Sequence, residues 1–129
     1  MITEDRVTFE IAKLLEEKGF DEHCDYVYDG TTLKWLYGLF IFFGEPTDTN
    51  SKLKKCGNDE IITAPTIHMV LKWLREVHNI DVTITPDRKE NYTAMIFVNK
   101  ELPFTSIGSF QTYEKACEAA IKYILENLI

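Results

Sequence analysis

A chain of 129 residues is long enough for about one domain with a substantial buried core. Its composition, 45% hydrophobic and 27% charged, excludes a disordered protein and is typical of a globular one. The formal net charge of −7 opposes non-specific binding to nucleic acids, whose phosphates proteins contact mainly through lysine and arginine.

The cysteines and the apolar segments indicate the cellular compartment of the protein. Cys24, Cys56 and Cys117 are an odd number, without the close spacing of a disulfide framework or a zinc site. We therefore expect reduced thiols and a cytoplasmic location. The N-terminus does not resemble a signal peptide. The most apolar run, residues 35–43, is far shorter than the roughly 20 residues that cross a bilayer, so it predicts a buried strand and no membrane association.

The first part of the chain predicts a helix over residues 8–18. Thr8 is expected to cap its first turn, because a threonine hydroxyl accepts a backbone N–H there. Gly19 supplies a left-handed ending, and Phe20 is placed to pack back on Leu15 in a Schellman motif.

Strand patterns follow over residues 26–43, and Asp29-Gly30 within them predicts a hairpin. Residues 44–60 are polar and irregular, which indicates a long loop. Both tryptophans, Trp35 and Trp73, are expected to anchor the core.

The second half begins with the clearest pattern in the chain. A helix is predicted from Thr66 to Asn79, and its apolar side chains cover an arc of roughly 200°. We expect such a wide arc to contact a sheet and a second element. Strands then follow over residues 80–85, 92–99 and 104–109, and a last helix over residues 112–128.

These patterns predict a single α+β domain over residues 1–129. We expect one antiparallel sheet of about four to six strands, with three main helices packed on it.

Six carboxylates and His23 lie close together in residues 16–29. Such groups can hold a divalent cation, but their spacing matches no calcium loop. A solvated helix end with its loop is the favoured interpretation, and no metal or cofactor is predicted. A hydrolase with a deep pocket lined by these acids is a further hypothesis.

No motif of a phosphate-binding loop, a metalloprotease or a nucleophile elbow is present in the sequence, so no catalytic residue is predicted. Pro86-Asp87 after one strand and Asn99-Lys100 after the next resemble a nuclease pattern. That chemistry needs a carboxylate two residues before the lysine, where this chain has Val98. The pattern therefore does not support a nuclease.

The order helix–strand–strand–strand–helix over residues 66–128 is similar to that of double-stranded RNA-binding domains. Those domains contact phosphates through lysines at the start of the last helix, whereas here Lys115 lies beside Glu114. A smaller basic face is the candidate nucleic-acid contact, weighed against an ordinary solvated surface. It consists of His68, Lys72 and Arg75 on the predicted helix, with Arg88 and Lys89 in the turn after the next strand.

Three segments resemble small phage- and prophage-associated proteins of the Bacteroides group. They are Ala64-Pro65-Thr66, the run KWLREVH from Lys72, and the run TYEKA from Thr112. The similarity covers residues 64–128 well and the first 60 residues more loosely. No activity is established for this group, so the resemblance implies only a setting: a bacterial cytoplasm and genes of phage origin.

The sequence therefore predicts a phage- or prophage-associated accessory protein that is not an enzyme and acts through protein–protein contacts. Its expected partner is another protein or a second copy of the chain. The alternative is a nucleic-acid-binding regulator that uses the basic face, although the net charge disfavours it.

Overall fold

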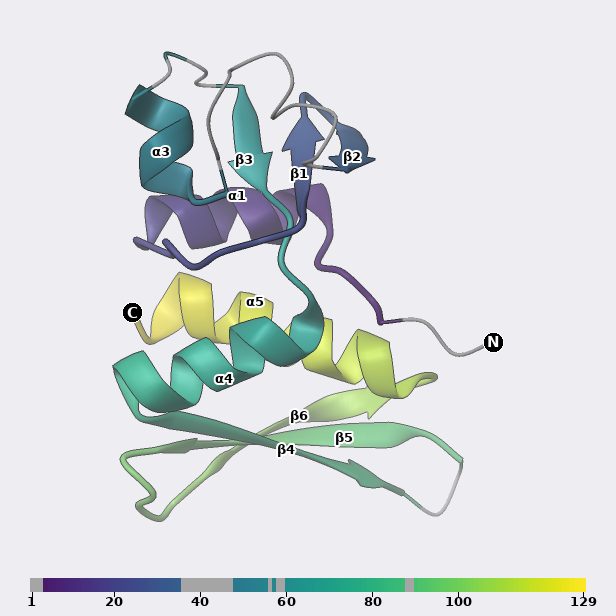
Figure 1. Cartoon of the computed structure of the whole chain (residues 1–129). Helices are drawn as coiled ribbons and strands as arrows, with labels where there is room; N and C mark the ends of the chain where they lie inside the picture. The colour runs from purple at the N-terminus through teal and green to yellow at the C-terminus, as the bar shows by residue number, and fades with distance from the viewer. Residues whose placement is uncertain (1–3, 36–47, 56, 58–59, 88–89) are drawn as a thin grey trace. The chain divides into compact units, whose positions relative to one another are not determined.

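A computed structural model of the chain describes residues 4–35, 48–55, 57, 60–87 and 90–129. Within these residues the chain forms four helices and six strands (Figure 1). The predicted α+β class is confirmed. The number of strands agrees with the prediction, but they form two three-stranded antiparallel sheets and not one.

The chain divides into two compact units, Arg6–Pro65 and Thr66–Ile129, the second of which also includes Met1–Asp5. The boundary at Pro65 and Thr66 lies inside the segment where the sequence predicts a helix start. In chain order the elements of the first unit are α1 (Phe9–Glu17), β1 (Tyr26–Asp29), β2 (Thr32–Trp35), α3 (Asn50–Lys55) and β3 (Ile61–Thr63).

Helix α1 begins and ends as predicted. The Thr8 hydroxyl accepts a hydrogen bond from the backbone N–H of Ile11. At the other end, Gly19 has a φ of 87° and the Phe20 N–H donates to the Leu15 carbonyl over 2.9 Å. This is the Schellman geometry, and it turns the buried Phe20 ring back toward the helix.

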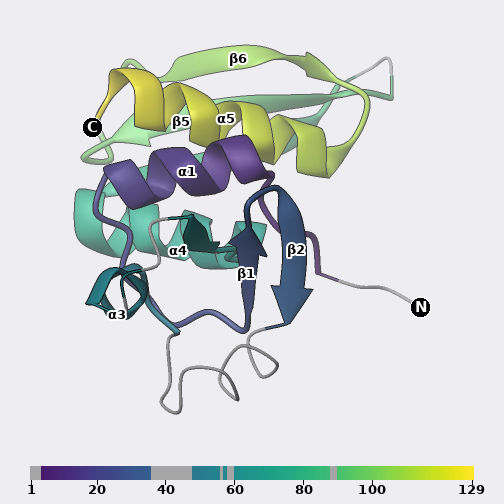
Figure 2. The same ribbon diagram turned by 90° about the horizontal axis from the view of Figure 1, so that it is seen from above.

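The first sheet has the strand order β2-β1-β3. The predicted hairpin is confirmed: Asp29 pairs with Thr32, and Gly30 takes a positive φ of 62° in the two-residue turn (Figure 2). The prediction for Trp35 is wrong, because its side chain is 58% exposed in a β2 strand with no buried residue. The remainder of the apolar run, residues 36–43, lies outside the described residues.

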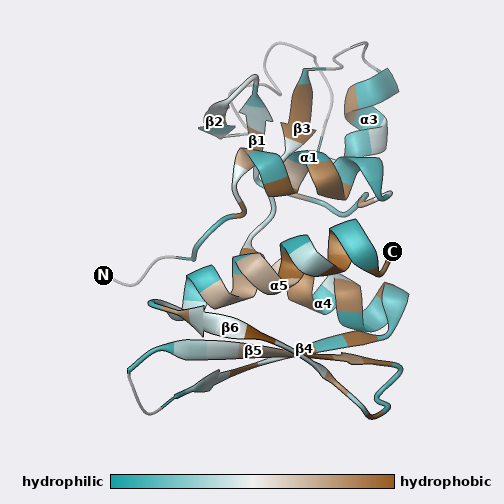
Figure 3. Ribbon diagram, turned by 180° about the vertical axis from the view of Figure 1, so that it is seen from behind, coloured by the Kyte–Doolittle hydropathy of each residue, from teal (hydrophilic) through white to brown (hydrophobic). Residues whose placement is uncertain are grey.

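The long loop expected over residues 44–60 is corrected by the structure, because it contains α3. The side chain of Leu53 in this helix is fully buried and joins Val27 of β1 in a small core, with Ile61 of β3 packed against it. In Figure 3 the hydrophobic colour of β3 marks the strand that lines this core. The helix therefore forms because it covers apolar strands, and not because of its own sequence pattern.

The second unit has the predicted order of elements, with boundaries that differ by about one residue. Thr66 and Thr112 cap the two helices through their hydroxyls, and Asn79 ends the first of them in the left-handed conformation. The elements are α4 (Ile67–His78), β4 (Ile80–Pro86), β5 (Tyr92–Val98), β6 (Thr105–Phe110) and α5 (Tyr113–Asn127).

Both helices of this unit cover the same face of the sheet β4-β5-β6 (Figure 1). Helix α5 contacts all three strands, and α4 contacts both β4 and α5, so the expectation of two contacts for α4 is confirmed. The predicted apolar arc is too wide at one position, because Val77 is 59% exposed. Trp73 is buried, as predicted.

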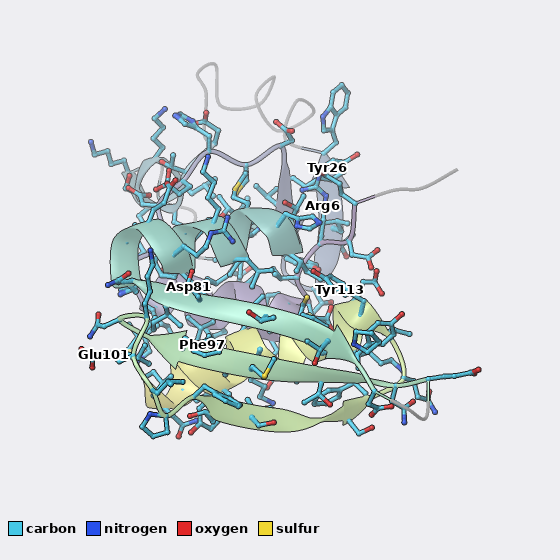
Figure 4. The ribbon with its side chains drawn as sticks, turned by 90° about the horizontal axis from the view of Figure 1, so that it is seen from below. Arg6, Tyr26, Asp81, Phe97, Glu101 and Tyr113 are labelled. Carbon is cyan, nitrogen blue, oxygen red and sulfur yellow. The ribbon has the colours of Figure 1, made fainter. Side chains whose placement is uncertain are left out.

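The register of the sheet separates two faces. Ile80, Ala94 and Ile96 are buried on the face beneath the helices. We call the opposite side the open face, because no described element of this unit covers it (Figure 4). The open face is formed by Asp81, Thr83 and Thr85 of β4 and by Thr93, Met95 and Phe97 of β5.

Candidate interaction surfaces

Helix α4 brings three of the predicted nucleic-acid contacts together. His68, Lys72 and Arg75 are spaced by four and three residues, so they share one face, and all three are exposed. The buried face of the helix, which includes Val70 and Leu74, holds this basic face toward solvent. The other two predicted contacts, Arg88 and Lys89, lie outside the described residues.

The start of α5 provides an acidic environment and not a basic one. Burial raises the pKa of Glu118, and the carboxylates of Asp5 and Glu114 raise it further. Negative charge that already opposes ionisation of a neighbouring carboxyl also opposes the approach of a phosphate. The surface where double-stranded RNA-binding domains present lysines is thus unfavourable for phosphate here.

The acidic segment 16–29 ties the first unit together at several points. Glu16 pairs with Lys54 of α3 over 2.8 Å, and the Asp21 carboxylate accepts a hydrogen bond from the backbone N–H of Ser51. Asp29 pairs with Lys34 across the hairpin over 2.7 Å. These contacts support the interpretation of the segment as a helix end with its loop.

His23 belongs to this arrangement, because its ring nitrogen bonds the carboxylate of Asp48. Lys52 pairs with the other oxygen of the same carboxylate over 2.9 Å. Partial burial of Asp48 opposes its ionisation, but the hydrogen bonds from Lys52 and His23 outweigh this effect and lower its pKa. The carboxylate therefore joins the loop after α1 to α3.

Sequence reasoning missed the polar residue at the centre of this unit. Asn50, the first residue of α3, donates to the Phe20 carbonyl over 2.8 Å and accepts from the Thr63 N–H over 2.9 Å. Its Oδ1 also accepts from the Thr63 hydroxyl over 3.2 Å. Because both partners are distant in sequence, only the fold brings them together.

The two described cysteines, Cys24 and Cys117, are both buried thiols. Burial raises the pKa of the Cys24 thiol, and likewise that of Cys117, from 9.0 to about 11. Since the thiolate is the reactive form of cysteine, neither residue suits a nucleophile at neutral pH. For Cys117 this confirms the predicted core position.

The described residues contain no group of three or more histidine, cysteine, aspartate or glutamate side chains arranged to hold a metal ion. Asp87, from the nuclease-like pattern, instead closes its own turn by accepting from the Asn91 N–H and the Ser109 hydroxyl, each over 3.1 Å. None of the described helices is long and apolar enough to span a membrane.

Three exposed apolar side chains lie in the segment where β5 turns into β6. Val98 is 41% exposed, Leu102 78% and Phe104 43%. Asn99 and Lys100 between them both have positive φ, and the Glu101 N–H donates to the Val98 carbonyl, which makes a tight turn. We call Val98, Leu102 and Phe104 the turn patch.

Phe104 connects the turn patch to the open face, whereas Val98 shares the face of Ala94 and Ile96. The rings of Phe97 and Phe104 are in contact, with centroids 5.2 Å apart and an interplanar angle of 38°. Asp81 of β4 is the cross-strand partner of Phe97, and Figure 4 places both at the same end of the sheet as Glu101. The signal for this surface is in the sequence, since Met95 and Phe97 are apolar at positions that alternate with a buried face.

No protein-family model, curated protein or solved structure matches this chain.

Proposed function

We propose that the chain is a phage- or prophage-associated accessory protein of the bacterial cytoplasm, which acts through protein contacts and not by catalysis. The observation that carries the proposal is the turn patch, where Leu102 and Phe104 expose much of their side chains and Phe104 contacts Phe97 of the open face.

The contact of Phe104 with the apolar open face, in a turn that also exposes Leu102, is what favours a binding role. Single exposed apolar residues are ordinary on protein surfaces, whereas contiguous ones mark contact sites. Burying apolar surface against a partner is worth about 25 cal/mol per Å². Phe104 already rests on Phe97, so its ring loses little freedom on binding.

Two further observations support the proposal. Several reactive side chains that sequence reasoning considered have structural partners, as Glu16, His23 and Asp29 do, and Cys24 is a buried thiol. The phage setting is supported by the resemblance of the segments at 64–66, 72–78 and 112–116 to phage-associated proteins.

The test compares the full chain with a double variant, Leu102→Ser with Phe104→Ser. A matched control is Leu128→Ser, which removes a leucine that is 38% exposed at the end of α5. Each tagged protein is used to capture partners from native lysate, with identification by mass spectrometry, and its mass is measured by light scattering after gel filtration.

We expect the wild type and the control to retain the same partner, or to self-associate. The affinity of the double variant for that partner, or for itself, should be lower by at least about tenfold. A wild-type chain that is strictly monomeric and captures nothing would overturn the proposal. Equal capture by the double variant would do the same.

The second candidate function is nucleic-acid binding, favoured by the shared exposed face of His68, Lys72 and Arg75. A fluorescence titration with labelled duplex DNA and duplex RNA at low salt tests it, because phosphate contacts are strongest there. Binding that the pair Lys72→Ala with Arg75→Ala weakens would support this function. No binding at micromolar protein would remove it.

A further inference from the structure

The end of the open face combines two features that attract the same kind of ligand. Phe97 and Phe104 form an aromatic pair, and Phe104 is 43% exposed. The face of an aromatic ring carries partial negative charge and attracts a cation that comes within about 6 Å of its centre. The pair is therefore suited to an arginine or lysine side chain.

Two carboxylates lie at this end of the sheet, Asp81 on the strand next to Phe97 and Glu101 in the turn after β5. Asp81 is directly opposite Phe97 in the register of β4 and β5, which places their Cβ atoms about 4.5–5.5 Å apart. Glu101 is exposed in the segment that joins Phe97 to Phe104 (Figure 4). A carboxylate beside the ring adds a charge-assisted hydrogen bond to a guanidinium or ammonium group.

We infer that this end of the open face binds a basic segment of a partner protein, with an arginine or lysine side chain over the rings of Phe97 and Phe104 and between Asp81 and Glu101. The inference rests on the proposed function and names the chemistry of its partner. The net charge of −7 favours the encounter with a basic partner over longer distances.

Single-stranded nucleic acid is the competing occupant, since bases also stack on exposed phenylalanines. Such surfaces carry a track of positive charge for the phosphates, whereas Asp81 and Glu101 bring negative charge to this end of the sheet. A protein ligand with positive charge is therefore favoured.

Lys100 can distinguish a basic peptide from a nucleic acid, because its charge should affect their binding in opposite directions. It is exposed in the tight turn, next to Glu101 in sequence. Its ammonium group repels a basic ligand and attracts a phosphate. Replacing it by alanine should strengthen the binding of a basic peptide and weaken that of a nucleic acid.

The experiment measures fluorescence anisotropy of the full chain with three labelled probes. The first is a short peptide with arginine at every second position, the second is the same peptide with glutamate instead of arginine, and the third is a single-stranded oligouridine. Chemical-shift changes in amide NMR spectra then map the surface that each probe contacts. Far-UV circular dichroism verifies that each variant is folded.

We expect the arginine peptide to bind, with shifts centred on Asp81, Phe97 and Glu101, and the glutamate peptide not to bind. The isosteric double variant, Asp81→Asn with Glu101→Gln, should bind the arginine peptide at least about tenfold more weakly. Thr83→Ser, on the same face, should leave the affinity for the arginine peptide unchanged, and Lys100→Ala should increase it. Equal affinity in the carboxylate variant, or shifts elsewhere on the chain, would overturn the inference. So would tighter binding of oligouridine that Lys100→Ala weakens.

The same variants distinguish this inference from the proposed function when they are used in the capture experiment. If the change of Leu102 and Phe104 abolishes partner capture but the change of Asp81 and Glu101 does not, the proposed function stands and the inference fails. If neither pair alters capture, the proposed function itself fails.

Discussion

Asn50 provides the sharpest test of how the first unit is held together. It is 6% exposed, and its side chain joins the end of α1, the start of α3 and strand β3 through hydrogen bonds to Phe20 and Thr63. In the variant Asn50→Ala, the Phe20 carbonyl and the Thr63 N–H lose these partners in a buried place. Helix α3 also loses its attachment to β3 at this residue.

The magnitude follows from the number of bonds lost. Leaving a buried backbone group unsatisfied costs about 1–3 kcal/mol, so the two groups together predict a loss of about 2–6 kcal/mol in the free energy of unfolding. This is a large part of the about 5–15 kcal/mol that stabilises a typical protein. Urea denaturation followed by circular dichroism measures the total loss.

Hydrogen exchange of the Thr63 amide provides a local measurement, because this N–H donates to Asn50. The amide should exchange faster in Asn50→Ala by the factor that the lost stability predicts. Ser51→Ala is the control, since Ser51 is the exposed neighbour in the same helix and should cost under about 0.5 kcal/mol. A loss for Asn50→Ala no greater than that of the control would refute the reasoning.

Three further predictions concern single side chains. Gly108→Ala should lower the free energy of unfolding by about 1–3 kcal/mol, because Gly108 has a φ of 60° and a Cβ there would lie 2.9 Å from Cδ2 of Phe110. The control Gly19→Ala, with a φ of 87° but open space around the new Cβ, should lower it less; thermal melts measure both. Burial raises the pKa of Cys117 to about 11, so the thiol should resist a thiol reagent at pH 7, and stability should fall as the pH rises from 9 toward 11, where the unfolded thiol ionises first. Glu118→Gln should raise the melting temperature at pH 7 and lose this effect in acid, because burial and neighbouring carboxylates raise the pKa of Glu118 and its charged form destabilises the fold. Equal melting temperatures at pH 7 for Glu118→Gln and wild type would contradict the last of these.

The elements that could be predicted from sequence are those whose ends are set by nearby residues. Thr8, Thr66 and Thr112 each accept a hydrogen bond from an N–H three residues later, and Asn79 ends its helix through its own backbone conformation. Such signals act within a few residues, so the sequence pattern contains them in full.

The elements that could not be predicted depend on contacts between distant residues. Helix α3 has six residues and three lysines, a composition that also suits a loop. It is held by the fully buried Leu53 and by bonds from Asn50 to residues 20 and 63. The pairing of β1 with β3, which makes two sheets where one was expected, likewise joins segments more than 30 positions apart.

The same limit divides the candidate surfaces. Helical periodicity was sufficient to predict that His68, Lys72 and Arg75 share a face, because that property belongs to one helix. The sequence shows that Met95 and Phe97 are apolar, but not that their face is left open or that Phe104 contacts Phe97, because this contact forms only after β5 turns back into β6. An apolar residue in a strand is expected in the core, and only the arrangement of the helices decides which face is covered.

The composition of strand β5 supports the proposed binding at the open face. Its sequence is YTAMIFV, and every residue from Ala94 to Val98 is apolar, so both faces of the strand carry apolar side chains. This is typical of strands that are covered on two faces. In its own unit, α4 and α5 both pack on one side, which buries Ala94 and Ile96 and leaves Met95 and Phe97 on the other. This central strand has apolar side chains on both faces, but the helices of its unit cover only one of them. Burying the other face against a partner would therefore lower the free energy. The cross-strand partner of Phe97 is the carboxylate of Asp81, so the cover that fits this end of the sheet is one that brings positive charge.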